Sequence, residues 1–206
     1  MNKFFIGLSV LLTVLVVWAW FNKTKTNQNT IPKTKIEVPK PNRNNNMEKL
    51  TLTSPAFVAG GFIPAKYTCD GEEINPPLKI SGVPKEADSL VLVMDDPDIP
   101  SAVKEKNGID KFNHWVLYNL PPDTTEIPEG IKGETGLNTT GAAAYIGPCP
   151  PPQYEPTEHR YVFRLYAIKG KLNFIKTPTL DEVETAAKSA ALAEAELVGR
   201  YGRARK

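Results

Sequence analysis

Two histidines are the only imidazoles in the chain, and each begins a segment with the pattern of a β-strand. His114 opens the run His-Trp-Val-Leu-Tyr, and His159 opens the run His-Arg-Tyr-Val-Phe. A third apolar run ends in the carboxylates Asp95, Asp96 and Asp98. If these strand ends lie together, two imidazoles and one or two carboxylates share one site. Imidazole N–H groups can donate to an oxyanion, and carboxylates can orient the rings or accept an ammonium group.

A proline-rich loop precedes the second histidine. Residues 147–152 read Gly-Pro-Cys-Pro-Pro-Pro. Proline fixes φ and removes a backbone donor, so we expect a rigid, irregular loop beside the start of the strand that carries Tyr161. Backbone N–H groups around Gly147 and Cys149 could donate to the same anion. A phosphate attached to an aminoalcohol would satisfy both signs of charge, and its affinity should rise as the imidazoles become protonated.

Two catalytic alternatives use the same residues. Histidine and aspartate could ligate a metal, but the close i, i+4 spacing of a metal-binding helix is missing from the sequence, so we expect no metal. Cys149 could act as a thiolate nucleophile. It could also simply pack in the core, or form a disulfide with Cys69 in an oxidising compartment. We therefore expect neither a catalytic residue nor a cofactor.

The elements that would position these residues are mainly β. The strand at 159–166 alternates strictly, with His159, Tyr161, Phe163 and Leu165 on one face. Residues 89–94 form a continuous apolar run, typical of a strand buried on both faces. Further strands are expected at 50–53, 78–80 and 113–120, a loop at 99–110, and irregular structure at 130–144. Thr179 and Glu182 form a capping-box pattern, and apolar residues from Leu180 to Leu197 recur at helical spacing. One helix, ending near Gly199 or Gly202, is predicted to close the chain.

Charge and composition divide the chain in two. The 206 residues include 25 Lys and Arg and 23 Asp and Glu. Residues 1–49 hold 8 of the basic and 2 of the acidic residues, which leaves 17 and 21 for residues 50–206. The second part is mildly acidic, so nucleic acid is not an expected partner. The 41% hydrophobic content and 19 prolines of the whole chain favour one domain with many loops.

The first part resembles a membrane anchor followed by a linker. Residues 4–21 carry no charge and would reach ~27 Å as a helix, about the thickness of the hydrocarbon layer. A cleaved signal peptide is the alternative, although a good small-x-small cleavage site is missing. We predict an anchor at 1–22, a disordered linker at 23–49 and one folded domain at 50–206. The lysines after residue 21 favour a cytoplasmic domain, whereas the basic start before an apolar run favours export. We expect a single-pass membrane protein with an extracytoplasmic domain.

Several motifs in this order resemble the phosphatidylethanolamine-binding protein family. They are Asp96-Pro97-Asp98-Ile99-Pro100, His114-Trp115, Gly147-Pro148-Cys149-Pro150-Pro151 and His159-Arg160-Tyr161-Val162-Phe163. The segments at 67–71 and 75–78 are similar to its bacterial and archaeal branch of Raf-kinase-inhibitor-like proteins. The resemblance covers about residues 50–202. It implies an antiparallel β-sandwich with Greek-key connections and a small pocket for phosphate or a phospholipid head group. The implied pocket residues are Asp96, Asp98, His114, His159 and Tyr161, with Gly147, Cys149 and Pro150 in the wall.

These observations predict a non-catalytic binding protein for phosphorylated small molecules or phospholipid head groups such as phosphoethanolamine. Members of the family also modulate kinase pathways and inhibit peptidases, so a kinase or protease partner is implied as well. The alternative is a protein–protein module that inhibits a kinase or peptidase through its surface. A weaker alternative is a hydrolase that uses Cys149 or a metal.

Overall fold

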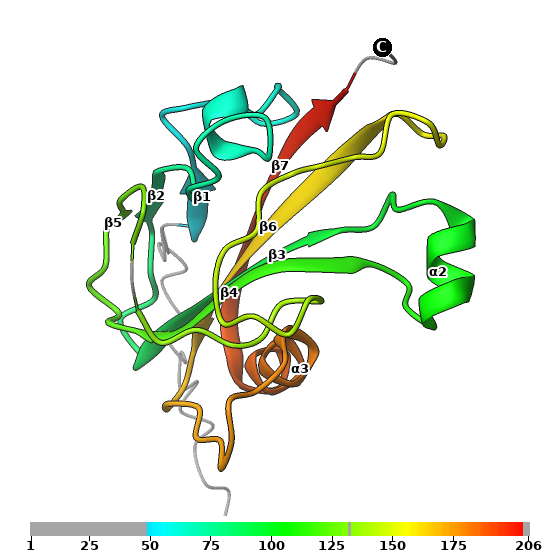
Figure 1. Ribbon diagram of the computed structural model, residues 1–206. Helices are drawn as coiled ribbons and strands as arrows, with labels where there is room; N and C mark the ends of the chain where they lie inside the picture. The colour runs from blue at the N-terminus through cyan, green and yellow to red at the C-terminus, as the bar shows by residue number, and fades with distance from the viewer. Residues whose placement is uncertain (1–48, 132, 204–206) are drawn as a thin grey trace, which may run out of the picture. The chain divides into compact units, whose positions relative to one another are not determined.

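The computed structural model describes residues 49–131 and 133–203, and these are built around two antiparallel sheets (Figure 1). The larger sheet has the order β4 (Phe112–Leu120), β3 (Ser89–Asp96), β6 (Glu158–Ile168) and β7 (Ala191–Gly202). The smaller has the order β1 (Thr51–Thr53), β2 (Leu78–Ser81) and β5 (Glu126–Ile127). The helices are η1 (Ala65–Tyr67), α2 (Ser101–Asn107) and α3 (Leu180–Ala190). The predicted mainly β fold with antiparallel sheets is confirmed.

Strand β3 organises the core, and all eight of its residues are buried. Leu90, Leu92 and Met94 pack in the cluster that lies between the two sheets. Val91 and Val93 pack on the opposite face, in the cluster that includes the buried apolar residues of α3. Because successive side chains of a strand point to opposite faces, this pattern explains the continuous apolar run in the sequence.

The pairing of β3 brings the ends of three strands together. Asp96 pairs with Phe112 at the start of β4, and Asp95 pairs with Val162 near the start of β6. Both neighbours are antiparallel to β3, so the end of β3 lies beside the beginnings of β4 and β6. His114 and His159, far apart in the sequence, therefore come to the same edge of the larger sheet.

The predicted C-terminal helix is correct at its start and wrong at its end. Thr179 and Glu182 form the reciprocal capping box, and the helix begins at Leu180. It stops at Ala190, and residues 191–202 form β7, which pairs with β6 along nearly its whole length. The segment is rich in alanine and glutamate, which favour helices. Its buried residues Ala195 and Leu197 nevertheless alternate with exposed glutamates, and pairing with β6 overrides the local helix propensity.

The segment 99–110, predicted as a loop, contains the helix α2. This helix has no buried residue, so the amphipathic pattern that reveals longer helices is missing. It follows Pro100 and ends at Gly108, which has a left-handed conformation with φ of 63°. Ala102, Glu105 and the two lysines favour a helix, which accounts for this short helix between a proline and a glycine.

The predicted anchor at residues 1–22 lies outside the described residues, as does the linker at 23–49 except for its last residue. Within residues 49–131 and 133–203, none of the helices is both long enough and apolar enough to cross a membrane.

Candidate functional site

The strand ends assemble one buried group of polar side chains, which we call the imidazole cluster. Its members are Asp96, His114, His159 and Tyr161. Their exposed fractions are 3%, 4%, 1% and 0%, respectively. The Tyr161 ring contacts both imidazoles, with ring centroids 5.2 Å from His114 and 6.5 Å from His159. The structure therefore places these four residues side by side at the edge of the larger sheet.

His159 uses both ring nitrogens within the protein. Nδ1 lies 2.6 Å from Oδ2 of Asp96, and Nε2 lies 2.9 Å from the carbonyl oxygen of Pro156. Both partners are acceptors, so both nitrogens donate and the ring is an imidazolium. Burial by itself would lower the His159 pKa, but the hydrogen bond and charge of Asp96 outweigh it and raise that pKa. His159 therefore joins the end of β3 to the proline-rich loop.

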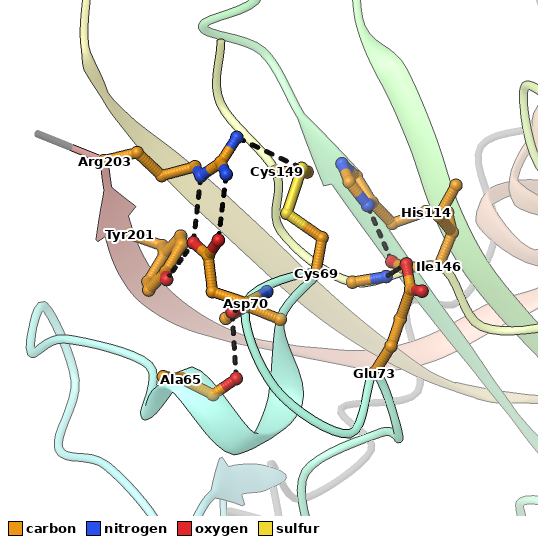
Figure 2. Close-up of a disulfide and its surroundings, with 11 residues drawn as sticks. Ala65, Cys69, Asp70, Glu73, His114, Ile146, Cys149, Tyr201 and Arg203 are labelled. Carbon is orange, nitrogen blue, oxygen red and sulfur yellow. Dashed lines mark hydrogen bonds and ion pairs between the residues drawn. A yellow bond between two sulfur atoms is a disulfide. The ribbon is translucent and has the colours of Figure 1, made fainter. Parts of the chain in front are cut away.

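His114 has one ring nitrogen fixed and one unengaged. Nδ1 lies 2.8 Å from the carbonyl oxygen of Ile146 and must donate its proton there. Burial lowers the His114 pKa and outweighs the Ile146 carbonyl and the charge of Asp96, both of which raise it. The ring is therefore neutral, and Nε2 is an acceptor. Figure 2 shows this second nitrogen on the side of the ring away from Ile146. No side chain or backbone group of residues 49–131 and 133–203 bonds to it.

The hydroxyl of Tyr161 is buried without a hydrogen-bond partner among the described residues. Burial and the negative charge of Asp96 raise its pKa, whereas the backbone amide of Cys149, too poorly placed for a regular hydrogen bond, acts to lower it. An unpaired buried hydroxyl costs about 1–3 kcal/mol. Such a group calls for a partner that residues 49–131 and 133–203 do not supply.

The other two carboxylates of the strand end do not join the imidazole cluster. Asp98 binds Arg160 through both oxygens, at 2.7 and 2.8 Å, and the Arg160 guanidinium lowers the pKa of Asp98. Asp95 points to the opposite face of the sheet, where it binds Lys111 at 2.9 Å and Arg164 at 2.6 Å. Of the three carboxylates considered from the sequence, only Asp96 contacts an imidazole.

The loop that starts at Gly147 forms a wall fixed to the segment after η1. A Cβ atom on Gly147 would lie 2.9 Å from both Thr68 Cα and Tyr67 O, so only glycine permits this close approach. Cys149 forms a disulfide with Cys69. Cys149 is exposed, whereas Pro150 is buried.

Other contacts hold the same wall. The Gly147 amide donates to Glu73 at 3.3 Å, and the Tyr145 hydroxyl donates to the carbonyl of Tyr67 at 2.7 Å. Figure 2 shows Glu73 and Ile146 on one side of the disulfide and Arg203 on the other. The carbonyl that orients His114 thus belongs to a segment that is tied down at several points.

Residues from the end of the chain complete the outer side of the wall. Arg203 binds Asp70 at 2.9 Å through two nitrogens, and Tyr201 donates to the same carboxylate at 2.6 Å. A third nitrogen of Arg203 lies 3.8 Å from the sulfur of Cys149. Sequence analysis missed these residues, together with Ile146 and Glu73. Their partners are 32 to 133 positions away, and no local pattern signals such contacts.

A second polar group lies on the α3 side of the sheet. Glu184 and Asp95 share Lys111, at 2.8 and 2.9 Å, and both carboxylates are buried. Burial alone would raise the pKa of Glu184, but hydrogen bonds from Lys111 and Lys188 lower it to about 2. This network joins α3 to the sheet. In the described part of the chain, no three or more His, Cys, Asp and Glu side chains are grouped to hold a metal ion.

Comparison with known proteins identifies the family. The family model described as phosphatidylethanolamine-binding protein matches residues 53–202. A UPF0098 protein of Methanothermobacter thermautotrophicus is 41% identical over 162 residues, which cover 75% of this chain and 99% of the relative. A UPF0098 protein of Chlamydia trachomatis is 43% identical over 154 residues, or 74% of this chain and 98% of the relative.

Two solved structures are also similar. The crystal structure of CT736, a phosphatidylethanolamine-binding protein homologue from Chlamydia trachomatis, has a TM-score of 0.68 and 41% identity, and the match covers 75% of this chain and 98% of that one. Escherichia coli YbcL has the same fold, with a TM-score of 0.65 at 23% identity over 75% of this chain and 99% of that one. The chain therefore belongs to the phosphatidylethanolamine-binding protein family, in the branch of its bacterial and archaeal relatives.

Proposed function

We propose that this protein binds a phosphate-bearing small molecule or phospholipid head group at the imidazole cluster, without chemical turnover. The observation that carries the proposal is that two residues with contacting rings each have a polar group without a partner in the described part of the chain. His114 presents an unengaged Nε2, and the neighbouring Tyr161 carries a buried hydroxyl that lacks a partner in the described chain. A ligand that carries both a protonated oxygen and an unprotonated oxygen could donate to Nε2 and accept from the Tyr161 hydroxyl, and so complete both groups.

The charges around the cluster support a small anion. The His159 imidazolium is paired with Asp96, so the pair is neutral as a whole. An incoming anion therefore meets hydrogen-bonding groups without an unpaired carboxylate of the cluster. The wall from Gly147 to Pro150 is already fixed, so little conformational entropy of this loop is lost when a ligand binds.

Binding without turnover fits the state of two side chains that could do chemistry, Cys149 and His159. The sulfur of Cys149 is bonded to Cys69, so it is not a free thiolate nucleophile. His159 has both nitrogens engaged by acceptors and cannot take up a proton from a substrate. The support for a cysteine-dependent hydrolase is therefore removed.

Calorimetric titration with phosphoethanolamine and inorganic phosphate tests the proposal. The domain from Asn45 to Lys206 is the compact unit to use, because relatives that consist almost entirely of it exist as whole proteins. His114→Ala should weaken binding by about 10-fold or more, since a buried hydrogen bond to a charged ligand is lost. Glu126→Ala, an exposed position on β5 in the other sheet, should bind like the wild type. A wild-type domain that binds neither compound would refute the proposal and favour an inhibitory protein–protein surface.

We further propose that residues 4–21 hold the domain at a membrane, on its extracytoplasmic side. The exposed disulfide at Cys149 supports this location, because disulfides persist in oxidising compartments. Membrane fractionation of the full chain and of a chain lacking residues 1–46 tests the anchor. Protease treatment of intact cells tests the side. Full-length protein in the soluble fraction would refute the anchor, and protection from protease would refute the orientation.

A further inference from the structure

We propose that His114 selects ligands that bring their own hydrogen-bond donor, so that the site takes the protonated monoanion of a phosphate monoester in preference to an equally charged sulfate ester. This specificity rests on the proposed function, since it concerns the same site. It assigns to His114 the role of an acceptor, whereas histidines in anion sites usually act as donors.

The backbone fixes the orientation of the His114 ring. The side-chain Nδ1 donates to the Ile146 carbonyl at 2.8 Å, and the Ile146 amide donates back to the His114 carbonyl at 3.1 Å. The rings of Phe112 and Tyr161 contact the imidazole, with centroid distances of 4.9 and 5.2 Å. A ring turned over would lose the hydrogen bond to Ile146 and leave that carbonyl without this donor. The proton of a neutral His114 is therefore on Nδ1, and the lone pair is on Nε2.

Burial leaves the ring neutral despite the surrounding charges. Asp96 and Asp95, from β3, favour its protonation, and the imidazolium of His159, from β6, opposes it. Glu73, from the segment after η1, binds the Gly147 amide beside Ile146. Burial of the ring outweighs these charges, so a second proton on His114 is disfavoured.

An acceptor at this place decides which anion fits. The monoanion of a phosphate monoester has one P–OH donor and two oxygens that accept. Its hydroxyl can donate to Nε2 of His114, and another oxygen can accept from the Tyr161 hydroxyl. A sulfate monoester has the same charge and nearly the same shape but only acceptors, so its oxygen would face the lone pair of Nε2. A phosphate diester, the form of phosphate in a phospholipid, also lacks a P–OH group that could donate to Nε2.

Calorimetry with three matched ligands tests this selectivity in the Asn45–Lys206 domain. Methyl phosphate, methyl sulfate and dimethyl phosphate each carry one negative charge near pH 5, about one unit below the second pKa of a phosphate monoester, which is about 6. We expect methyl phosphate to bind about 10-fold or more tightly than either of the others, because neither of them has a donor for Nε2 of His114. Equal affinity for all three would overturn the inference and leave the proposed function standing. Binding of none would overturn both.

Phosphoethanolamine and its glycerol diester separate the two sources of the phosphate group. Tighter binding of the monoester supports the monoester preference and favours a free metabolite over a lipid head group. Tighter binding of the diester identifies a lipid head group, whose ammonium would have to be the donor to His114, and overturns the monoester preference.

Two further measurements test the hydrogen-bonding role of His114 without relying on a comparison of ligands of different sizes. The variant His114→Gln places an amide that can turn its NH2 or its oxygen toward the ligand, so the preference for methyl phosphate over methyl sulfate should disappear. In the wild-type domain, the 15N shifts of His114 in the complex should show a neutral ring protonated at Nδ1. An imidazolium in the complex with methyl phosphate would overturn the inference even if the variant fails to fold.

Discussion

Removing the disulfide between Cys69 and Cys149 should lower the free energy of unfolding by about 2–4 kcal/mol. The two cysteines are separated by 80 residues. For a loop of that length, the loss of chain entropy in the unfolded state predicts about 4.5 kcal/mol at 25 °C. Measured effects are usually smaller, because real unfolded chains keep some structure.

The folded state should survive the loss of the disulfide. The Cys69 amide still donates to the Pro148 carbonyl at 3.2 Å, and Tyr145 still bonds to Tyr67 at 2.7 Å. The bidentate pair of Asp70 with Arg203 holds the outer side of the wall. The effect therefore acts mainly through the unfolded chain, which gains freedom when the 80-residue crosslink is absent.

Guanidinium unfolding of the Asn45–Lys206 domain measures the effect, with the oxidised protein compared with the double variant Cys69→Ser, Cys149→Ser. The variant should unfold at lower denaturant, and added reductant should not change it further. Reductant should bring the wild type close to the variant. A difference below about 0.5 kcal/mol would refute the reasoning, because the entropy of so long a loop cannot be that small unless the reduced unfolded chain keeps these two loops together.

Three other predictions concern stability. The pKa of His159 is raised in the folded state, so its contribution is complete below its unfolded pKa, near 6.5, and is lost as the pH rises through the folded value. Melting temperatures between about pH 5 and 9 should show this loss in the wild type and not in Asp96→Asn; parallel curves would contradict it. Glu184 has a pKa of about 2 instead of 4.5, so its contribution is present above the unfolded value and is lost as the pH falls toward about 2. Urea unfolding should show a shallower acid dependence in Glu184→Gln, and an unchanged slope would count against it. Thr179→Ala should cost about 1 kcal/mol by removing the capping box of α3, whereas Thr179→Ser should keep most of it; equal losses would exclude capping as the cause.

Local patterns in the sequence were enough to locate most strands and the start of α3. The alternation from His159 to Leu165 reflects one face of β6 packed in the core, and the unbroken apolar run from Ser89 reflects burial of β3 on both faces. The Thr179 capping box marks the first residue of α3 because its hydrogen bonds span only three positions. These signals are carried by neighbouring residues, so they can be recognised without knowing the fold.

The end of α3 could not be found in this way. Residues 191–202 have a composition that favours a helix, and their strand conformation depends on pairing with β6, whose residues lie about 20 to 45 positions earlier in the chain. The intrinsic preference for a helix is worth only tenths of a kcal/mol per residue. Cross-strand side-chain pairs contribute a similar or larger amount each, so pairing with β6 can outweigh it.

The residue types of the candidate site were evident from the sequence, since the histidines, Asp96 and Tyr161 stand at strand ends. Their roles were decided by the tertiary structure. Because successive side chains of a strand point to opposite faces, Asp96 of β3 lies toward His159 and Asp95 lies on the other face of the sheet. The carbonyl oxygen of Pro156 accepts a hydrogen bond from Nε2 of His159. The carbonyl oxygen of Ile146, 32 positions from His114, holds the proton of the His114 ring on Nδ1. The sequence specifies which groups are available for hydrogen bonding, but which donor meets which acceptor depends on contacts between distant segments, and these exist only in the folded chain.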